Sequence, residues 1–400
     1  MSHGARGGAS AQVEAFEPSI SARIPELDGL RGTAILLVLI CHYFANASHP
    51  PIGFVIDHLI TITAIGWSGV DLFFVLSGFL IGGILLDCRE SPNYFKAFYL
   101  RRVHRILPVY YGWIVLFALA VLTTAYVYPK PLYLNPPGMN VSIHELRVIP
   151  TYLAFLQNIF YSPTPPEWIW FVVTWSLAVE EQFYIVAPPL IRYLSKQVLI
   201  GVLVLTVCAA PFLRFFMFRF HPEMDHFYQF GMPCRADSLS LGMLAALAWR
   251  WPQFRRFLAG RPQLAVRFVA YSFVGVIALL WWLVRPPNVV TATIGYSWLA
   301  FFCVFVLVLV LSRPQSLLGT VMRTKWLRGL GTISYCVYVI HFAVNQLAHR
   351  LLLNQEPSIG NVKGILVTLC ATGVTLTIAS LSWKYLEKPM VSRGHRFSYN

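Results

Sequence analysis

The chain has 400 residues, of which 57% are hydrophobic and only 12% are charged. Soluble domains carry about a quarter charged residues, so this composition excludes an ordinary soluble enzyme or binding module. The formal net charge of +14 would suggest a nucleic-acid partner in a soluble protein. Here the basic residues lie between long apolar blocks, as the positive-inside rule expects of a membrane protein. We therefore predict an all-α, polytopic membrane protein that does not bind nucleic acid.

The chain begins with a small, polar segment rich in Gly, Ser and Ala, residues 1–26. It lacks the apolar core of a cleaved signal peptide, so we expect a disordered cytoplasmic tail. A single transmembrane domain is expected over residues 27–390, and a short cytoplasmic tail over residues 391–400.

The apolar blocks predict ten membrane crossings, because one crossing needs about 20 consecutive apolar residues. They are expected at residues 31–48, 66–86, 107–128, 171–193, 198–220, 231–249, 265–284, 291–312, 329–351 and 363–385. A shorter apolar patch at 149–160 is expected to form a re-entrant or interfacial helix.

The distribution of Lys and Arg orients these crossings. With the N-terminus in the cytoplasm, the inner segments hold 23 of the 31 basic residues and the outer segments hold six. This bias predicts an even number of crossings of a cell membrane, with both termini in the cytoplasm. The long outer segment, residues 129–170, is rich in Pro, Tyr and Trp. Two interpretations stay open for its aromatic residues, an interfacial belt, which is favoured, or a surface for stacking sugars.

Ionisable residues inside the apolar blocks are functional candidates, since each costs about 2.5–3.5 kcal/mol or more in hydrocarbon. Arg31 opens the first block and His42 follows eleven residues later. On a helix this spacing places both on one face, about 16 Å apart along the axis. An imidazole is well suited to take a proton from a hydroxyl group, so His42 is the candidate catalytic base.

A second cluster contains Arg102 and Arg105, which are neighbours on a helix because they are three residues apart. Guanidinium groups suit phosphates, so the pair is a candidate site for the diphosphate or 3′-phosphate of coenzyme A. Ordinary anchoring at the positive inner face explains the pair equally well.

Two adjacent carboxylates, Glu180 and Glu181, lie inside an apolar run. They point about 100° apart on a helix, so at least one should face a protein or water-filled interior. One of them is expected to orient His42 or to pair with an arginine. Both are candidate catalytic residues.

Several further residues are candidates for binding the substrate. Arg235 and Asp237 neutralise each other in the simpler interpretation, and contact the acceptor or the buried carboxylates in the other. Asp71 and Ser77 lie at the start of the second crossing, beside small residues that allow helices to pack closely. His341 is a candidate as well, although a structural hydrogen bond is favoured for it.

These segments together resemble the acyltransferase-3 family of integral membrane acyltransferases. The resemblance extends from Leu27 to Pro389. It is carried by the arginine–histidine spacing and by GVDLFFVLSGF, RxxR followed by IxP, WSLAVEEQFY, RADSLSLG, LGTISYCVYVIH and YLEKP.

The resemblance implies a ten-helix core and an acyl-CoA donor, such as acetyl-CoA, that approaches from the cytoplasm as a co-substrate. The acceptor implied is a hydroxyl group, often of a sugar on a glycan, a lipid-linked saccharide or an antibiotic. His42 would be the essential histidine, and Arg31, Arg102 and Arg105 would bind or orient the donor. No tightly bound cofactor is implied. No metal site is expected either, since the seven cysteines are scattered and form no CxxC pair.

A secondary transporter or exporter is the alternative function, since it would share the many crossings and the buried charges. Such proteins usually show inverted repeats and helices broken at matching points, and neither is evident in this sequence. A non-catalytic membrane scaffold would have little use for buried carboxylates and a buried histidine. The identity of the acceptor, the acyl chain and the oligomeric state stay undetermined at this stage.

Overall fold

The computed structural model describes residues 24–45, 47, 53–126, 143–160, 170–284 and 288–399. Within these ranges the chain forms helices and their connections, without a strand. The helices are α2 (Pro25–Ile40), α3 (Phe54–Thr63), α4 (Gly69–Asp87), α5 (Tyr94–Tyr126), α6 (Ile149–Leu153), α8 (Trp175–Tyr193), α9 (Lys196–Phe220), α10 (Asp225–Phe230), α11 (Met232–Trp249), α12 (Pro252–Ala259), α13 (Pro262–Leu283), α14 (Tyr296–Ser312), α15 (Leu317–Met322), α16 (Lys325–Leu353), α17 (Val362–Ser382) and α18 (Lys388–Gly394).

Short 3₁₀ or π-helical segments extend several of these helices. They are η1 (Cys41–Ala45), η2 (Ala64–Ser68), η3 (Ile143–Val148), η4 (Val172–Thr174), η5 (Pro222–Met224), η6 (Thr291–Gly295) and η7 (Trp383–Glu387). The expected disordered tail lies almost wholly outside the described residues, as do residues 129–142 and 161–169 of the expected aromatic segment.

Each of the ten predicted crossings falls on a helix. In the described part of the chain, eight helical segments are long and apolar enough to cross a membrane. The other two crossings correspond to α8 and α11, with 19 and 18 residues. At 1.5 Å per residue they too approach the thickness of the hydrocarbon core, but charged residues lower their apolarity. The predicted all-α polytopic fold is confirmed.

Several boundaries differ from the sequence prediction. Helix α2 begins at Pro25 and α5 at Tyr94, so the arginines expected at the mouths of crossings lie inside helices. Helix α3 was not predicted. The patch at 149–160 forms only the five-residue helix α6 followed by an irregular segment. Gln157 holds this segment in place, because it donates hydrogen bonds to the Tyr110 hydroxyl on α5 and to the Thr174 carbonyl oxygen in η4, just before α8.

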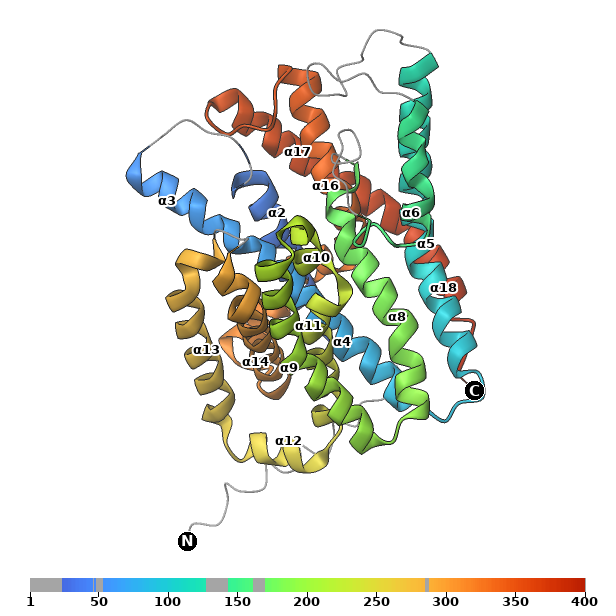
Figure 1. Cartoon of the computed structure of the whole chain (residues 1–400), viewed down its shortest axis with the longest axis vertical. Coiled ribbons are helices and arrows are strands. Elements are labelled where there is room, and N and C mark those ends of the chain that lie inside the picture. Colours follow the sequence, from blue (N-terminus) through green and yellow to red (C-terminus); the bar gives the residue numbers. More distant parts are fainter. Residues whose placement is uncertain are drawn as a thin grey trace.

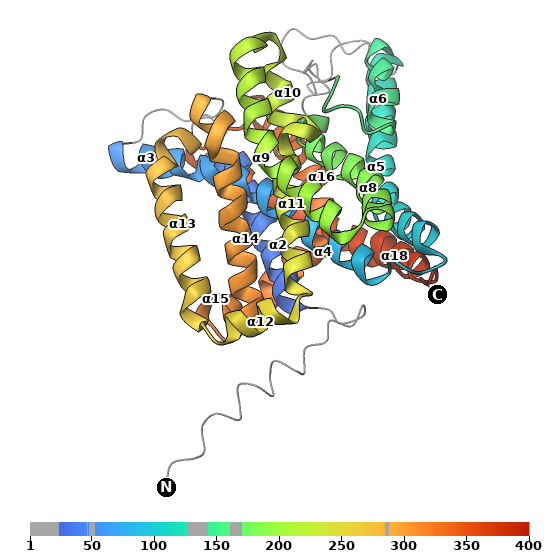
Figure 2. The same ribbon diagram turned by 60° about the horizontal axis from the view of Figure 1, so that its bottom comes forward.

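The helices divide into central and peripheral ones. Residues 57–87 contain α4, and 72% of the residues in their most apolar stretch are buried. The corresponding share is 17% for α13 and 22% for α9. Figures 1 and 2 agree with this division, since α13 stands at the edge of the bundle and α4 passes through it behind α11. Large apolar side chains such as Phe212 and Val274 are exposed on the outer helices, where lipid would cover them.

The connections predicted to be cytoplasmic gather at one end of the bundle, which we call the basic end. It contains the turns between α4 and α5 and between α8 and α9, together with α12 and α15; in Figure 1 the turn after α8 and helix α12 lie at the bottom. Helix α3 and the connection from α16 to α17 lie at the top of the same view, at what we call the distal end. The alternation of ends expected from the Lys and Arg count is therefore present in the fold.

A close crossing of two helices positions the buried charges described below. Helices α4 and α11 touch at Gly78 and Gly242. A Cβ atom on Gly78 would lie 2.0 Å from the Leu239 carbonyl oxygen, and one on Gly242 would lie 2.1 Å from the Val75 carbonyl oxygen. Only glycine allows these two backbones to approach so closely, as small residues do at many membrane helix interfaces.

We predict that Gly242→Val lowers the thermal unfolding midpoint of the purified protein, because the added methyl groups must push α11 away from α4 at a cost of about 1–3 kcal/mol or more. Intrinsic tryptophan fluorescence in detergent measures the midpoint. Gly201→Val on α9 is the control, since a Cβ atom there meets nothing within 4 Å, and it should leave the midpoint unchanged. Equal effects of the two substitutions would contradict this account of the crossing.

Candidate active site

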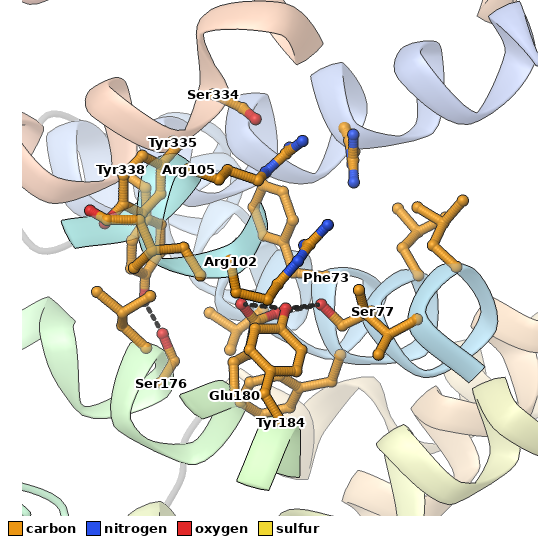
Figure 3. A pocket seen from close by; sticks show the side chains of 18 residues that line it. Phe73, Ser77, Arg102, Arg105, Ser176, Glu180, Tyr184, Ser334, Tyr335 and Tyr338 are labelled. Atoms are coloured by element: carbon orange, nitrogen blue, oxygen red, sulfur yellow. Dashed lines mark hydrogen bonds between the residues drawn. The ribbon is translucent and has the colours of Figure 1, made fainter. Parts of the chain in front are cut away.

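A cavity of about 100 Å³ opens between α2, α4, α5, α8 and α16 near the basic end, and we call it the basic cavity. Figure 3 shows it from close by. The polar residues among those that line it include Arg31, Ser77, Arg102, Arg105, Glu180 and Tyr184. Three of the predicted donor-binding residues and two further predicted site residues therefore meet in one place.

One wall of the basic cavity is a hydrogen-bonded group of three side chains. The Ser77 hydroxyl donates to Glu180 Oε1 at 2.6 Å and lies 3.1 Å from the Tyr184 hydroxyl. The Tyr184 hydroxyl also donates to Glu180 Oε2, at 3.4 Å. Figure 3 shows Arg102 above this group. The glutamate is held by neutral donors and keeps its position across from the arginine.

The three arginines of the basic cavity have no ion-pair partner among the described residues. Arg102 Nε is buried without a hydrogen-bond partner, and its guanidinium lies 5.8 Å from the centre of the Tyr184 ring and 6.0 Å from that of Phe98. Unpaired guanidinium groups around a cavity favour an anionic ligand, and their flat donor geometry suits phosphate oxygens.

A second cavity, of about 350 Å³, lies toward the distal end, and we call it the histidine cavity. It is built where α2 ends and where α4, α8, α11 and α14 begin. Its lining includes the side chains of His42, Trp67, Trp175, Arg235, Tyr296 and Tyr338. Its volume is within the range common for small-molecule sites.

His42 lies in η1, the π-helical turn that continues α2. Its Nδ1 atom is 2.9 Å from Nε2 of His341 on α16, and the two ring centres are 5.0 Å apart. The extra residue of a π-turn redirects the side chains of a helix, and such turns are frequent at functional sites. Arg31 and His42, which were expected on one face of a helix, line different cavities.

The two cavities share two lining residues, Val70 and Tyr338. The Tyr338 hydroxyl is fixed from the α8 side, 2.5 Å from the Ser176 hydroxyl and 2.8 Å from the Val173 carbonyl oxygen, to which it donates. The Ser176 contact is drawn in Figure 3. Val70 and Tyr338 thus form a thin partition between the arginines and His42.

Two buried ion pairs support the histidine cavity. Arg235 donates from Nη2 to Asp71 Oδ1 at 2.8 Å, and Arg214 Nη1 lies 3.0 Å from Asp237 Oδ2. The Arg235 guanidinium also lies 4.0 Å from the centre of the Tyr296 ring. The expected neutralisation of Arg235 by Asp237 is therefore wrong: α4 and α9 supply the partners, because α11 packs between them.

The remaining predicted residues take different places. Asp71, Asp237 and His341 are completely buried and line neither cavity, so they stand behind the residues that do. Glu181 lines neither cavity, and its Oε1 atom has no hydrogen-bond partner. Neither glutamate makes the expected hydrogen bond to His42 or ion pair with an arginine among the described residues. The catalytic roles of Glu180 and Glu181 stay predictions.

Some residues of the site were missed by the sequence reasoning. Tyr184 and Ser176 lie within the WSLAVEEQFY motif and Tyr338 within LGTISYCVYVIH, so the motifs marked the region but not these side chains. Arg214 lies inside the predicted crossing at 198–220 and was not a candidate site residue. Its charge inside an apolar block was the available signal, since a buried arginine is costly without an acidic partner or a polar cavity. No group of three or more His, Cys, Asp or Glu side chains capable of holding a metal ion occurs in the ranges that the structure describes.

Comparison with known proteins decides the family. Residues 24–384 match the family described as an acyltransferase domain. The chain belongs to this family. It is 28% identical over 388 residues to the peptidoglycan O-acetyltransferase OatA of Listeria monocytogenes, and 29% identical over 398 residues to a Bacillus subtilis protein provisionally named peptidoglycan O-acetyltransferase YrhL. A protein of Staphylococcus aureus (strain COL), provisionally named an O-acetyltransferase, is 28% identical over 386 residues.

These matches cover 93% of the chain but only 56–58% of each relative. The chain thus spans a little more than half the length of the curated relatives it matches. No solved structure is significantly similar to it. The family membership expected from the sequence motifs is confirmed.

We predict that Asp71→Leu lowers the free energy of unfolding of this protein by about 3–5 kcal/mol, because Arg235 is left buried without its carboxylate. The double variant Asp71→Leu/Arg235→Met should recover much of that loss, since it removes both charges at similar volume. Asp87→Leu, at the other end of α4, is the control: its pair with Arg250 is 21–22% exposed and should contribute only about 0–1 kcal/mol. Chemical unfolding in detergent measures all three. A double variant no more stable than Asp71→Leu would refute the pairing argument.

Proposed function

We propose that this protein is a membrane O-acyltransferase that moves an acyl group, most simply acetyl, from acyl-CoA to a hydroxyl group of a carbohydrate-containing acceptor. The proposal rests on one observation: a cavity with three unpaired arginines and a cavity with a histidine meet at the partition of Val70 and Tyr338. Membership of an acyltransferase family supplies the class of reaction.

The donor is assigned to the basic cavity by charge. Coenzyme A carries a diphosphate and a 3′-phosphate, and Arg31, Arg102 and Arg105 offer donors that no described carboxylate occupies. A volume of about 100 Å³ is too small for the whole donor. In this proposal the phosphates lie against the arginines at the basic end, on the cytoplasmic side of a bacterial inner membrane, and the thioester extends toward the partition. Acyl-CoA acts as a co-substrate, and no tightly bound cofactor is proposed.

The acceptor is assigned to the histidine cavity. Trp67, Trp175 and Tyr296 line it, and such rings offer flat apolar faces with polar edges to a sugar. Arg235 provides a charged donor for hydroxyl oxygens on the same wall. Two of the relatives carry peptidoglycan in their names, which agrees with a glycan acceptor.

In the proposed reaction His42 takes the proton of the acceptor hydroxyl, and the oxygen attacks the thioester carbonyl carbon. The new C–O bond forms as the C–S bond breaks, and the leaving thiolate receives the proton from the imidazolium. In a second route a His42 nitrogen bonds to the acyl carbon as the C–S bond breaks, and the acyl group then passes to the acceptor oxygen, whose proton goes to the thiolate. Both routes require a free lone pair on one nitrogen of His42.

We predict that Arg102→Ala raises KM for acetyl-CoA about tenfold or more, since a charge-assisted hydrogen bond contributes about 1.5–3 kcal/mol. The assay follows thiol release by the purified protein in lipid nanodiscs. Arg101→Ala is the matched control: the neighbouring arginine donates to the Phe397 carbonyl oxygen, stacks on Tyr399 and does not line the cavity. With acetyl-pantetheine, which lacks the phosphates, Arg102→Ala should change nothing. A similar rise in KM for both donors would contradict phosphate binding by Arg102.

We predict that His42→Ala lowers kcat at least about 100-fold while KM for acetyl-CoA stays within about twofold, because the base is lost and the donor site is not. Release of thiol from acetyl-CoA, measured with and without soluble glycan oligosaccharides, provides the rate and its dependence on the acceptor. The unfolding midpoint of the variant serves as the control for folding. Undiminished transfer by His42→Ala would remove the proposed role of this residue, and thiol release without any dependence on acceptor would oppose the proposed transfer.

A further inference from the structure

His341 makes three polar contacts through its ring, although it is completely buried. Its Nδ1 atom lies 2.8 Å from the Tyr338 carbonyl oxygen and 3.2 Å from the Val337 carbonyl oxygen. Its Nε2 atom faces His42 Nδ1 at 2.9 Å. No acidic partner of either histidine is found in the described residues.

The carbonyl oxygens determine where the protons lie. A carbonyl oxygen can only accept, so the hydrogen of a neutral His341 ring must be on Nδ1. Its Nε2 atom then carries a lone pair and accepts. Because a charge buried without a counter-ion is costly, the neutral form of both rings is favoured in this apolar surrounding. His42 must then donate from Nδ1, which leaves the lone pair of His42 on Nε2.

The surrounding contacts hold this arrangement in register. The Tyr43 hydroxyl, next to His42 in the π-turn, donates to the His341 carbonyl oxygen at 2.9 Å and lies 3.1 Å from the Thr375 hydroxyl. The Phe342 ring meets the His42 ring edge-on at 5.6 Å. The Tyr43 hydrogen bonds and the Phe342 ring contact hold the π-turn against α16, so the His42 ring has little freedom to flip.

We propose that His341 is a positioning residue that selects the Nδ1–H tautomer of His42, so that His42 Nε2 is the atom that reacts. This inference rests on the proposed acyl transfer and adds which nitrogen performs it. His42 Nε2 takes the acceptor proton as the C–O bond forms, and returns it to the thiolate as the C–S bond breaks. In the acyl-histidine route the same lone pair forms the bond to the acyl carbon. Meanwhile Nδ1–H donates to His341, which supports the positive charge on His42 without taking its proton.

The arrangement resembles in its logic the orienting carboxylate of a serine hydrolase triad, in which loss of the orienting group leaves the wrong tautomer and lowers kcat about 10⁴-fold. Here the orienting group is neutral, and backbone carbonyl oxygens determine its own tautomer. The histidine pair therefore carries no charge until the reaction begins.

The test compares His341→Leu with His341→Gln in nanodiscs. We expect His341→Leu to lower kcat about 10²–10⁴-fold with KM for acetyl-CoA unchanged, since the wrong tautomer of His42 becomes accessible. His341→Gln should restore part of kcat, because an amide oxygen can accept from His42 Nδ1. The pH profile of kcat should change in His341→Leu, a response that a merely structural role would not produce.

The tautomer itself is measured by solid-state NMR of protein labelled with ¹⁵N-histidine, with the His42 signals assigned through His42→Ala. We expect a protonated Nδ1 and an unprotonated Nε2 in the wild type, and a mixture of tautomers in His341→Leu. A protonated Nε2 on His42 in the wild type would overturn the inference, even in a protein that transfers acetyl groups. Absence of transfer by the wild type would instead count against the proposed function, and the NMR result would still decide the tautomer.

His349→Leu is the matched control. This histidine is also completely buried, lies two turns further along α16 and contacts the Thr368 hydroxyl through Nε2 at 2.9 Å. Its loss should lower the unfolding midpoint without changing kcat or the His42 tautomer. If His341→Leu behaved like His349→Leu, with kcat within about twofold of the wild type, His341 would be structural only.

Discussion

A charged side chain inside an apolar helix bundle needs either an opposite charge or a polar cavity beside it. The structure depends on which of the two each buried arginine has. On the distal side the arginines are paired: Arg235 with Asp71 and Arg214 with Asp237. On the basic side Arg31, Arg102 and Arg105 face a cavity without a paired carboxylate. Because an unpaired buried charge is costly, the second arrangement agrees with the anionic donor of the proposed function. In that proposal, pairing separates the supporting arginines from those that bind the donor.

The fold places these two arrangements at the two ends of one helix. Helix α2 carries Arg31 into the basic cavity, and its π-helical continuation carries His42 into the histidine cavity, about 16 Å further along the axis. Val70 and Tyr338 are the only residues common to both linings among the described residues. A donor and an acceptor that approach from opposite ends would therefore meet at this partition. In the proposed function, this arrangement suits transfer of the acyl group from one side of the membrane to the other.

The sequence predicted the helices well, because hydropathy is a local property. It could not predict which groups meet. Arg235 was matched with Asp237, its neighbour in the chain, whereas its partner Asp71 lies 164 residues away. That contact requires the close approach of α4 and α11 at Gly78 and Gly242. The spacing of residues along one helix does not predict which other helix packs against it. The π-turn that contains His42 was likewise not predicted, since a regular helix was assumed.

The sequence also did not predict which side chain contacts His42. A carboxylate is the usual group that orients a catalytic histidine, so Glu180 and Glu181 were the natural candidates. In the structure Glu180 is held by Ser77 and Tyr184 in the basic cavity, and His341 contacts His42 instead. A neutral partner avoids a permanent negative charge beside a site that, in the proposed function, admits a thioester into apolar surroundings. It also keeps the glutamate on the side of the partition where the arginines lie, so that each cavity retains the charge suited to its own ligand.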